Sequence, residues 1–361
     1  MEFKEIAVVG AGIIGMTTAY RLSQLGHNVV IIDPELNQHK NCDRYENASK
    51  ASLGILMGNI FRRSTGRSWR LRQRSMSLWP ELIQELYDVD KSIRIEKPLI
   101  QLASDKKELE LMKKLCRERA SLGLKLLDPA RDQTIKGSWP RNEYGGLISK
   151  NDGRINPHKL LKCLRISLDK LKVKTISTKV ISLSRSSQGK QAEWKIMLEN
   201  REILTKDFVI ICSALGSQSL LNKIGHEQQM EAVLGQAIHL TLNDDDQSNW
   251  EDWPAVITSN GINLIPLEKN EILIGATLEP GIKPSRSALS KLKSLNGLAP
   301  KWIKNVSIKK QWYGIRARPL GQPAPLLKTI EPGLIINTAH YRNGILLAPA
   351  CAEWVANQIK T

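Results

Sequence analysis

The sequence predicts an α/β fold in which a parallel, doubly wound sheet is interleaved with a second, mostly antiparallel sheet. Three observations predict it. The segment "EIAVVGAGIIG" joins a short apolar run to a glycine pattern and a helical period, which is typical of a βαβ opening. Residues 145–280 are rich in short strand-like runs. No Gly-, Pro- or Ser-rich linker separates the two regions, so we expect the two units to alternate along the chain.

The composition is that of an ordinary globular protein. The 361 residues are 41% hydrophobic and 25% charged, which predicts about two domains. No window approaches the roughly 18 uninterrupted apolar residues of a membrane span, and the N-terminus lacks the pattern of a signal peptide. The five cysteines are scattered, without the spacing of zinc ligands or of a disulfide framework. These features predict a reduced, cytoplasmic protein with no metal site.

The net charge of +17 is the one unusual value. Such a charge favours attraction to nucleic acid, acidic lipid or an anionic ligand, and it is also typical of a lysine-rich lineage. Most of it is spread along the chain, so we do not expect a nucleic-acid partner. The exception is "RRSTGRSWRLRQR", which places six arginines between Arg62 and Arg74. We expect this cluster to form a solvated helix face, and the alternative is a surface that steers an anionic substrate.

Hydrophobic periodicity predicts the order of the elements. Residues 5–9 form a strand, a helix follows, and "NVVIID" forms a second strand. The region 65–122 is mostly helical, interrupted at Pro80 and by the strand "PLIQLAS". Helices return at 284–297 and 346–359. The strands expected from 145 to 280 are "GGLISK", "VKTISTKVISLS", "EWKIMLE", "FVIICSA", "GQAIHLTL", "INLIPL" and "EILIGATL".

The glycine pattern near the N-terminus predicts a dinucleotide site. Gly10, Gly12 and Gly15 follow a strand and open a helix, which is the required setting of G-x-G-x-x-G. The first glycine permits the tight turn, the second lets the backbone approach a pyrophosphate, and the third lets helix and strand pack closely. Asp33 ends the second strand, where a ribose hydroxyl is expected. NAD and FAD share this pattern, so it does not choose between them.

Seven segments of the chain carry a family resemblance. They are, in order, "GHNVVIID", "GILMG", "NDGRINP", "MEAVLGQ", "ILIGATLEPG", "WYGIRARPLGQPAPLL" and "HYRNGILLAPACAEWVANQI". In this order the chain resembles the D-amino acid oxidase superfamily, and within it the glycine oxidases most closely. The resemblance covers nearly the whole chain. It implies a Rossmann-type FAD-binding domain, interleaved with a mostly antiparallel substrate domain that roofs the flavin.

The resemblance also implies how the two domains divide the chain. We expect the FAD-binding domain at 1–85, 145–225 and 325–361. We expect the substrate domain at 86–144 and 226–324.

The same resemblance implies where FAD binds. The adenine is expected against the backbone of Val180, and the flavin along residues 340–346. A helix beginning near Gly344, with Pro349 early in it, is expected to point its positive end at the flavin. No cysteine lies between Cys212 and Cys351, so we expect FAD to be non-covalent. The expected FAD contacts are Gly10, Gly12, Ile13, Ile14, Gly15, Asp33, Ala48, Ser49, Leu53, Gly54, Ile55, Val180, His340, Tyr341, Arg342, Asn343, Gly344, Ile345 and Leu346.

Arg316 and Arg342 match the family's ligands for the substrate carboxylate, a task that suits the planar, permanently charged guanidinium. Asn263 falls where glycine oxidase has a carboxylate-binding tyrosine. The resemblance implies that a small amine or amino acid, glycine-like, is oxidised to an imine by hydride transfer to FAD, with oxygen or a quinone as electron acceptor. No side chain needs to act as a catalytic acid or base.

Two alternatives stay open, and both are favoured by the positive charge. One is a flavin enzyme acting on an amine tethered to RNA. The other is a non-catalytic flavin-fold protein that binds nucleic acid or membrane with a basic face. The sequence leaves a homo-oligomer open as well.

Overall fold

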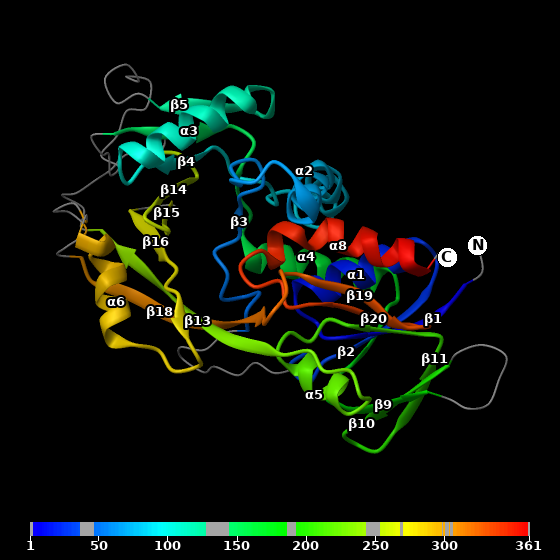
Figure 1. Ribbon diagram of the computed structural model, residues 1–361. Coiled ribbons are helices and arrows are strands. Elements are labelled where there is room, and N and C mark those ends of the chain that lie inside the picture. Colours follow the sequence, from blue (N-terminus) through cyan, green and yellow to red (C-terminus); the bar gives the residue numbers. More distant parts are fainter. Residues whose placement is uncertain are drawn as a thin grey trace.

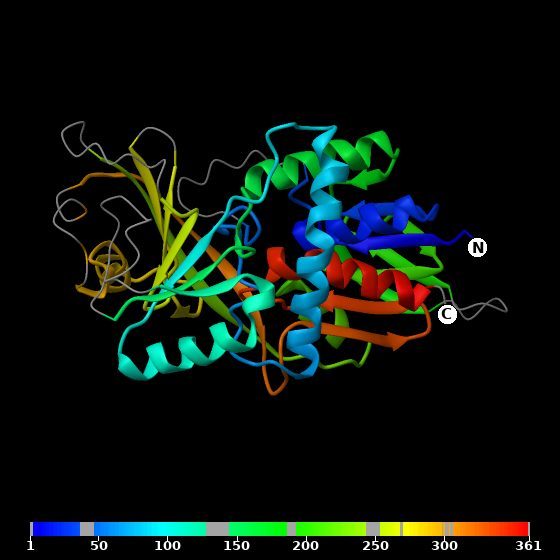
Figure 2. The same ribbon diagram turned by 90° about the horizontal axis from the view of Figure 1, so that it is seen from above.

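The computed structural model describes residues 3–36, 47–127, 144–185, 193–242, 253–267, 270–297, 299, 303 and 306–359. Cys42 lies outside these residues. Two large sheets lie side by side, with long helices gathered over one of them (Figures 1 and 2).

The first sheet has six strands in the order β19-β20-β12-β1-β2-β8. All neighbours are parallel except β19 and β20. It therefore draws on segments from both ends and the middle of the chain. The strands are β1 (Glu5–Val9), β2 (Asn28–Ile32), β8 (Lys174–Ile176), β12 (Phe208–Ile211), β19 (Leu326–Glu331) and β20 (Leu334–Thr338).

The central strands β1, β2 and β12 are largely apolar without alternation because both faces of the sheet are covered there. Ile6 and Val8 of β1 belong to the core cluster beneath the helices. Ala7 and Val9 point the other way, into a core shared with a three-stranded antiparallel sheet. The helices on the first face are α1 (Ile13–Gln24), α2 (Gly66–Tyr87), α4 (Pro157–Lys170) and α8 (Gly344–Ile359). The other face is covered by β9 (Val180–Arg185), β10 (Trp194–Leu198), β11 (Ile203–Lys206) and α5 (Gly216–Asn222).

The second large sheet has nine strands, mostly antiparallel, in the order β17-β13-β16-β15-β14-β4-β6-β5, with β18 also paired to β13. A two-stranded ribbon of β3 and β7 lies between the two sheets (β3 is labelled in Figure 1). The strands of the large sheet are β4 (Leu99–Leu102), β5 (Leu124–Leu127), β6 (Gly146–Ser149), β13 (Met230–Thr241), β14 (Val256–Ser259), β15 (Ile262–Pro266), β16 (Glu271–Gly275), β17 (Glu279–Pro280) and β18 (Ile308–Pro319). The ribbon is β3 (Ile55–Leu56) and β7 (Gly153–Arg154). Further helices with described bounds are α3 (Lys106–Glu118) and α6 (Arg286–Lys293), with 3-10 turns at Ala120–Leu122 and Leu295–Gly297.

The predicted fold class is confirmed, and three local expectations need correction. The helix α2 runs through Pro80 without a break. Pro80 is exposed, so its ring does not pack against the core. Water can hydrogen-bond to the backbone carbonyl that lacks the N–H of a non-proline residue at this position. The helix α4 stands within the region expected to be strand-rich, where Asn156 caps it and Pro157 opens it. The strand β6, expected at the start of an FAD-binding segment, pairs with β4 in the nine-stranded sheet.

The loop between β3 and α2 is held from two sides by buried charged groups. The carboxylate of Asp152 accepts hydrogen bonds from the backbone N–H groups of residues 58–60, at 2.9 to 3.1 Å. The guanidinium of Arg119 donates to the carbonyl oxygens of Asn59, Phe61 and Arg63. Three backbone N–H groups and three carbonyl groups of the loop are therefore bonded by these two side chains.

We expect Asp152→Ala to lower the free energy of unfolding by about 3 kcal/mol, because several buried N–H groups lose their shared acceptor. Asp105→Ala is the matched control. Asp105 is an exposed N-cap that accepts one N–H bond, from Glu108, and its loss costs about 1 kcal/mol. Urea unfolding of the three proteins measures both values. Equal losses at the two positions would contradict the structural role assigned to Asp152.

Candidate functional site

The turn from β1 into α1 is built by glycines that no larger residue can replace. Gly10 has a φ of +110°, and a Cβ on it would lie 2.9 Å from the backbone of Cys212. A Cβ on Gly15 would lie 1.8 Å from the carbonyl oxygen of Gly10. The helix α1 therefore starts directly against the turn. Its first N–H groups are left at the carboxyl end of β1, where a helix N-terminus attracts an anion.

Two of the expected FAD residues hold this turn. The Asp33 carboxylate accepts from the N–H of Ala11 at 2.7 Å and, through its other oxygen, from the N–H of Glu35 at 2.7 Å. The Ser49 hydroxyl accepts from the N–H of Ile13 at 2.9 Å. A Cβ on Gly12 would lie 3.1 Å from the same hydroxyl. The glycine turn is therefore fixed by side chains from two other segments.

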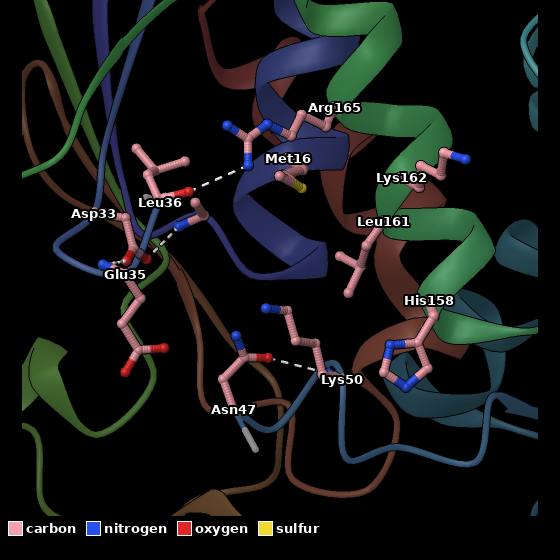
Figure 3. A pocket seen from close by; sticks show the side chains of 11 residues that line it. Met16, Asp33, Glu35, Leu36, Asn47, Lys50, His158, Leu161, Lys162 and Arg165 are labelled. Carbon is pink, nitrogen blue, oxygen red and sulfur yellow. Dashed lines mark hydrogen bonds between the residues drawn. The ribbon is translucent and has the colours of Figure 1, made fainter. Parts of the chain in front are cut away.

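A pocket opens beside Asp33, with a volume of about 270 Å³ (Figure 3). Its lining combines two carboxylates with four basic side chains, a mixture that suits the hydroxyls and phosphates of a nucleotide. Arg165 is tied to this wall, donating to the carbonyl oxygen of Leu36 at 3.2 Å. Sequence reasoning missed the basic residues, since they come from two segments that only the packing of α4 brings together. The lining residues are Ala11, Met16, Asp33, Glu35, Leu36, Asn47, Lys50, His158, Leu161, Lys162 and Arg165.

The segment around β3 connects the two sheets. Gly54 has a φ of +75°, and a Cβ on it would lie 1.8 Å from the carbonyl oxygen of Ile155. Leu53 is buried and reaches the nine-stranded sheet, because its Cδ1 would lie 2.8 Å from a Cβ on Gly275. Ala48 is exposed and Ile55 is half-buried.

Val180, expected to meet the adenine, opens β9 and is buried against the far face of the six-stranded sheet.

The segment 340–346 lies at the start of α8, next to the start of α1. A Cβ on Gly344 would lie 3.9 Å from the Cγ2 of Ile13. Ala339 and Tyr341 adopt left-handed conformations, with φ of 51° and 54°, which non-glycine residues hold only where the surroundings impose them. The N–H of Tyr341 donates to the carbonyl oxygen of Ala317 at 3.1 Å. The segment is thereby joined to β18.

His340 is buried within this segment, and its Nε2 has no hydrogen-bond partner among the described residues. Burial, together with the charge of Arg67, lowers the pKa of His340 to about 3. The imidazole is therefore neutral at physiological pH.

The helix α2 crosses over α8 (Figure 2) and is hydrogen-bonded to the first turn of α8. The hydroxyl of Ser75 and the indole N–H of Trp79 both donate to the carbonyl oxygen of Leu346. Pro349 lies in the second turn of α8, not in the first. Because it has no N–H, it cannot make the usual helix hydrogen bond to the carbonyl oxygen four residues earlier.

The arginine cluster divides into two parts. Its other five members are exposed, as expected for a solvated helix face, but Arg72 is buried, with 8% of its surface exposed. For Arg72 the expectation of a solvated face is wrong, because it shares the inward face of α2 with Ser75 and Trp79. Two of the exposed arginines form ion pairs, Arg62 with Glu108 and Arg74 with Glu353.

Arg316 and Arg342 approach each other from β18 and from the segment 340–346. The Nη1 of Arg316 donates to the carbonyl oxygens of Leu234 and Thr277, each at 3.2 Å. Its guanidinium lies on the backbone of Gly235, where a Cβ would come within 2.2 Å of it. Burial, and then the like charge of Arg342, lower the pKa of Arg316 to about 10. Arg342 itself is exposed.

Asn263 is buried, and its amide joins two neighbours. Its Oδ1 accepts from the hydroxyl of Thr258 at 2.7 Å, and its Nδ2 donates to the carbonyl oxygen of Gly275 at 3.0 Å. One amide hydrogen remains for a further acceptor.

These residues fit FAD. The glycine turn places the start of α1 at the carboxyl end of β1, where a helix N-terminus favours a pyrophosphate, and Asp33 lines a pocket of about 270 Å³. His340, whose buried Nε2 has no hydrogen-bond partner among the described residues, lies just before the start of α8. None of the helices in the described ranges has the length and apolar character needed to cross a bilayer.

Comparison with known proteins agrees with this geometry. The chain is 27% identical to a glycine oxidase of Pseudomonas putida, over 97% of this chain and 93% of that protein. Its fold matches a glycine oxidase of Geobacillus kaustophilus with a TM-score of 0.81, at 22% identity over 100% and 95% of the two chains. It also matches FAD-bound L-α-glycerophosphate oxidase of Mycoplasma pneumoniae with a TM-score of 0.78, at 17% identity over 100% and 96% of the two chains.

The family model described as FAD dependent oxidoreductase matches residues 5–358. The chain therefore belongs to this family and is an FAD-dependent oxidoreductase.

Proposed function

We propose that the chain oxidises a small amino acid or amine, with glycine as the favoured substrate, to the corresponding imine. The observation that carries this proposal is the pair of arginines, Arg316 and Arg342. The residues next to them are joined by a backbone hydrogen bond, from the N–H of Tyr341 to the carbonyl oxygen of Ala317 at 3.1 Å. The charge of Arg342 lowers the pKa of Arg316, and two cations held together make a site for an anion. The relative from Pseudomonas putida is named a glycine oxidase, which supports a small amino acid.

The role of Arg316 follows from how it is held. Two carbonyl oxygens fix one end of the guanidinium, while within the described residues Nη2 and Nε have no acceptor, which leaves them for a carboxylate. Glu279 lies nearby and supports the positive charge of Arg316. Its own oxygens are occupied by Gln236, Thr277 and Ser285. Glu279 therefore leaves the Arg316 fork available for substrate.

The chemistry needs orientation more than acid–base groups. When bound, FAD supplies the acceptor for the substrate's hydride. Arg316 and Arg342 would hold the carboxylate so that the α-carbon faces the flavin along 340–346. Loss of hydride from the α-carbon and of a proton from the amine leaves the imine, which water hydrolyses. Oxygen or a quinone would then reoxidise the flavin.

An anaerobic screen of small amines and amino acids against the purified protein tests the proposal. Bleaching of the flavin absorbance by glycine or a similar amino acid is the expected result. If free amino acids and amines leave the flavin oxidised while an amine on RNA bleaches it, the proposed substrate class is wrong.

We expect the purified protein to be yellow and to release FAD on heat denaturation, and Gly12→Val to abolish this binding. A branched side chain at position 12 blocks the approach of the pyrophosphate and meets the Ser49 hydroxyl. Gly12→Ala should lose less, because one methyl needs only a small movement of that hydroxyl. The ratio of flavin to protein absorbance measures the series. Full occupancy in the valine variant would place the cofactor elsewhere.

We expect Arg316→Ala to weaken substrate capture at least about thirty-fold, since breaking a buried charge pair costs roughly 2 to 5 kcal/mol. FAD should stay bound. Arg316→Lys should restore only part of the loss, because an ammonium lacks the planar fork. Lys309→Ala is the control, a cation of the same strand paired with Glu271. The rate of flavin reduction against substrate concentration gives the comparison. An alanine variant as fast as wild type would mean that no carboxylate is held here.

We expect the stability of the protein to fall on acidification through His340. Its native pKa is about 3, while an unfolded histidine titrates near 6.5. Between these two pKa values the unfolded chain binds a proton at His340 that the native state does not bind. The free energy of unfolding therefore decreases as pH falls below about 6.5. Between pH 7 and pH 5 this amounts to about 2 kcal/mol. His340→Gln should reduce the difference by that amount in denaturant titrations at equal flavin content. An unchanged pH dependence would show that His340 is not buried neutral.

A further inference from the structure

Arg72 is a buried cation without a counter-charge. Its Nη2 donates to the Oδ1 of Asn343 at 3.0 Å, and its guanidinium carbon lies 4.0 Å from the centre of the Phe61 ring. Within the described residues no carboxylate contacts it, and its Nε has no hydrogen-bond partner. Burial lowers its pKa to about 10, so it remains positively charged at neutral pH.

Two other buried arginines show what is missing at Arg72. Arg154 forms an ion pair with Glu96 at 2.9 Å. Arg119 donates to three backbone carbonyl oxygens. Arg72 has one neutral amide oxygen and one aromatic face. A buried charge compensated this weakly costs stability, and an apolar side chain of similar size would normally be favoured. An anion at this place would explain the arginine.

The position of Arg72 identifies that anion. Arg72, Ser75 and Trp79 occupy one face of α2, at i, i+3 and i+7, and all three bond to residues 343–346. This is the segment along which the flavin is placed. His340 is neutral and supplies no charge there. The N-terminal end of α8 contributes a partial charge of the same sign as Arg72.

We propose that Arg72 is a positioning residue that orients the Asn343 amide and raises the reduction potential of the bound flavin with its fixed positive charge. The inference rests on the proposed placement of the flavin along 340–346. A hydride would add two electrons and one proton, and so one negative charge, to a flavin bound there. A nearby cation stabilises that reduced form over the oxidised one.

The test compares the flavin reduction potential of Arg72→Gln with that of wild type, titrated against redox dyes in the absence of substrate. Glutamine keeps a donor for Asn343 and removes the charge. We expect the equilibrium constant for two-electron reduction to fall about tenfold, the order expected for one unit charge in a protein interior, which corresponds to about 30 mV. Arg72→Lys keeps the charge and should recover most of the shift.

Arg74→Gln is the control, because it removes the same charge from an exposed position two residues away. Its potential should match wild type. An unchanged potential in Arg72→Gln would overturn the proposal. So would a glutamine variant that unfolds or loses FAD, since Arg72 would then be needed for structure alone. No substrate enters this measurement. If the proposed substrate class is wrong, the amino acid screen will show it, and the reduction potentials can still be interpreted.

Discussion

The packing of Gly15 against the carbonyl oxygen of Gly10 is the constraint on which the site depends. No atom beyond hydrogen fits between them, because a Cβ would lie 1.8 Å from that oxygen. The start of α1 is therefore pressed against the end of β1. The start of α8 lies next to the start of α1, since a Cβ on Gly344 would be 3.9 Å from the Cγ2 of Ile13. Two helix N-termini from opposite ends of the chain thus converge, and both favour negative charge. That arrangement suits a cofactor with an anionic pyrophosphate and a ring that gains charge on reduction.

The substrate arginine and the flavin segment share one backbone contact. The carbonyl oxygen of Ala317, the residue after Arg316, accepts the N–H of Tyr341, the residue before Arg342. The other side of the segment is tied to α2 through Leu346. Since Tyr341 also holds a left-handed backbone, the segment has little freedom to shift without moving Arg316 as well. With the flavin along 340–346 and the substrate on Arg316, as proposed, main-chain hydrogen bonds would set the distance between them.

The sequence predicted the fold class and the glycine turn because both depend on local patterns. Apolar runs without alternation indicated a sheet covered on both faces, and Gly10 to Asp33 lie within one βαβ unit. Arg316 could be singled out only by family resemblance. The basic residues of the Asp33 pocket could not be found, because Lys50 and Arg165 meet only through the packing of α4. The burial of Arg72 was not predicted, because it stands among five other arginines in the sequence. A signal did exist, since extending the apolar stripe of Trp79, Leu82 and Leu86 backward by helical spacing reaches Ser75 and Arg72.

The neutral state of His340 has a different origin from the charge of Arg72, because it follows from the burial of the imidazole itself. Burial is the larger cause of the lowered pKa of His340, and the charge of the exposed Arg67, five residues before Arg72 on α2, lowers that pKa further. A protonated imidazole would place another positive charge at the start of α8, beside a helix N-terminus that disfavours it. Arginine keeps its charge throughout the physiological range, whereas histidine titrates within it. With the charge on Arg72 and none on His340, the electrostatic environment of this segment does not change with pH near neutrality. His340 can then occupy the segment for its shape and its ring nitrogens. Negative charge is stabilised instead by Arg72, which cannot lose its positive charge near neutral pH.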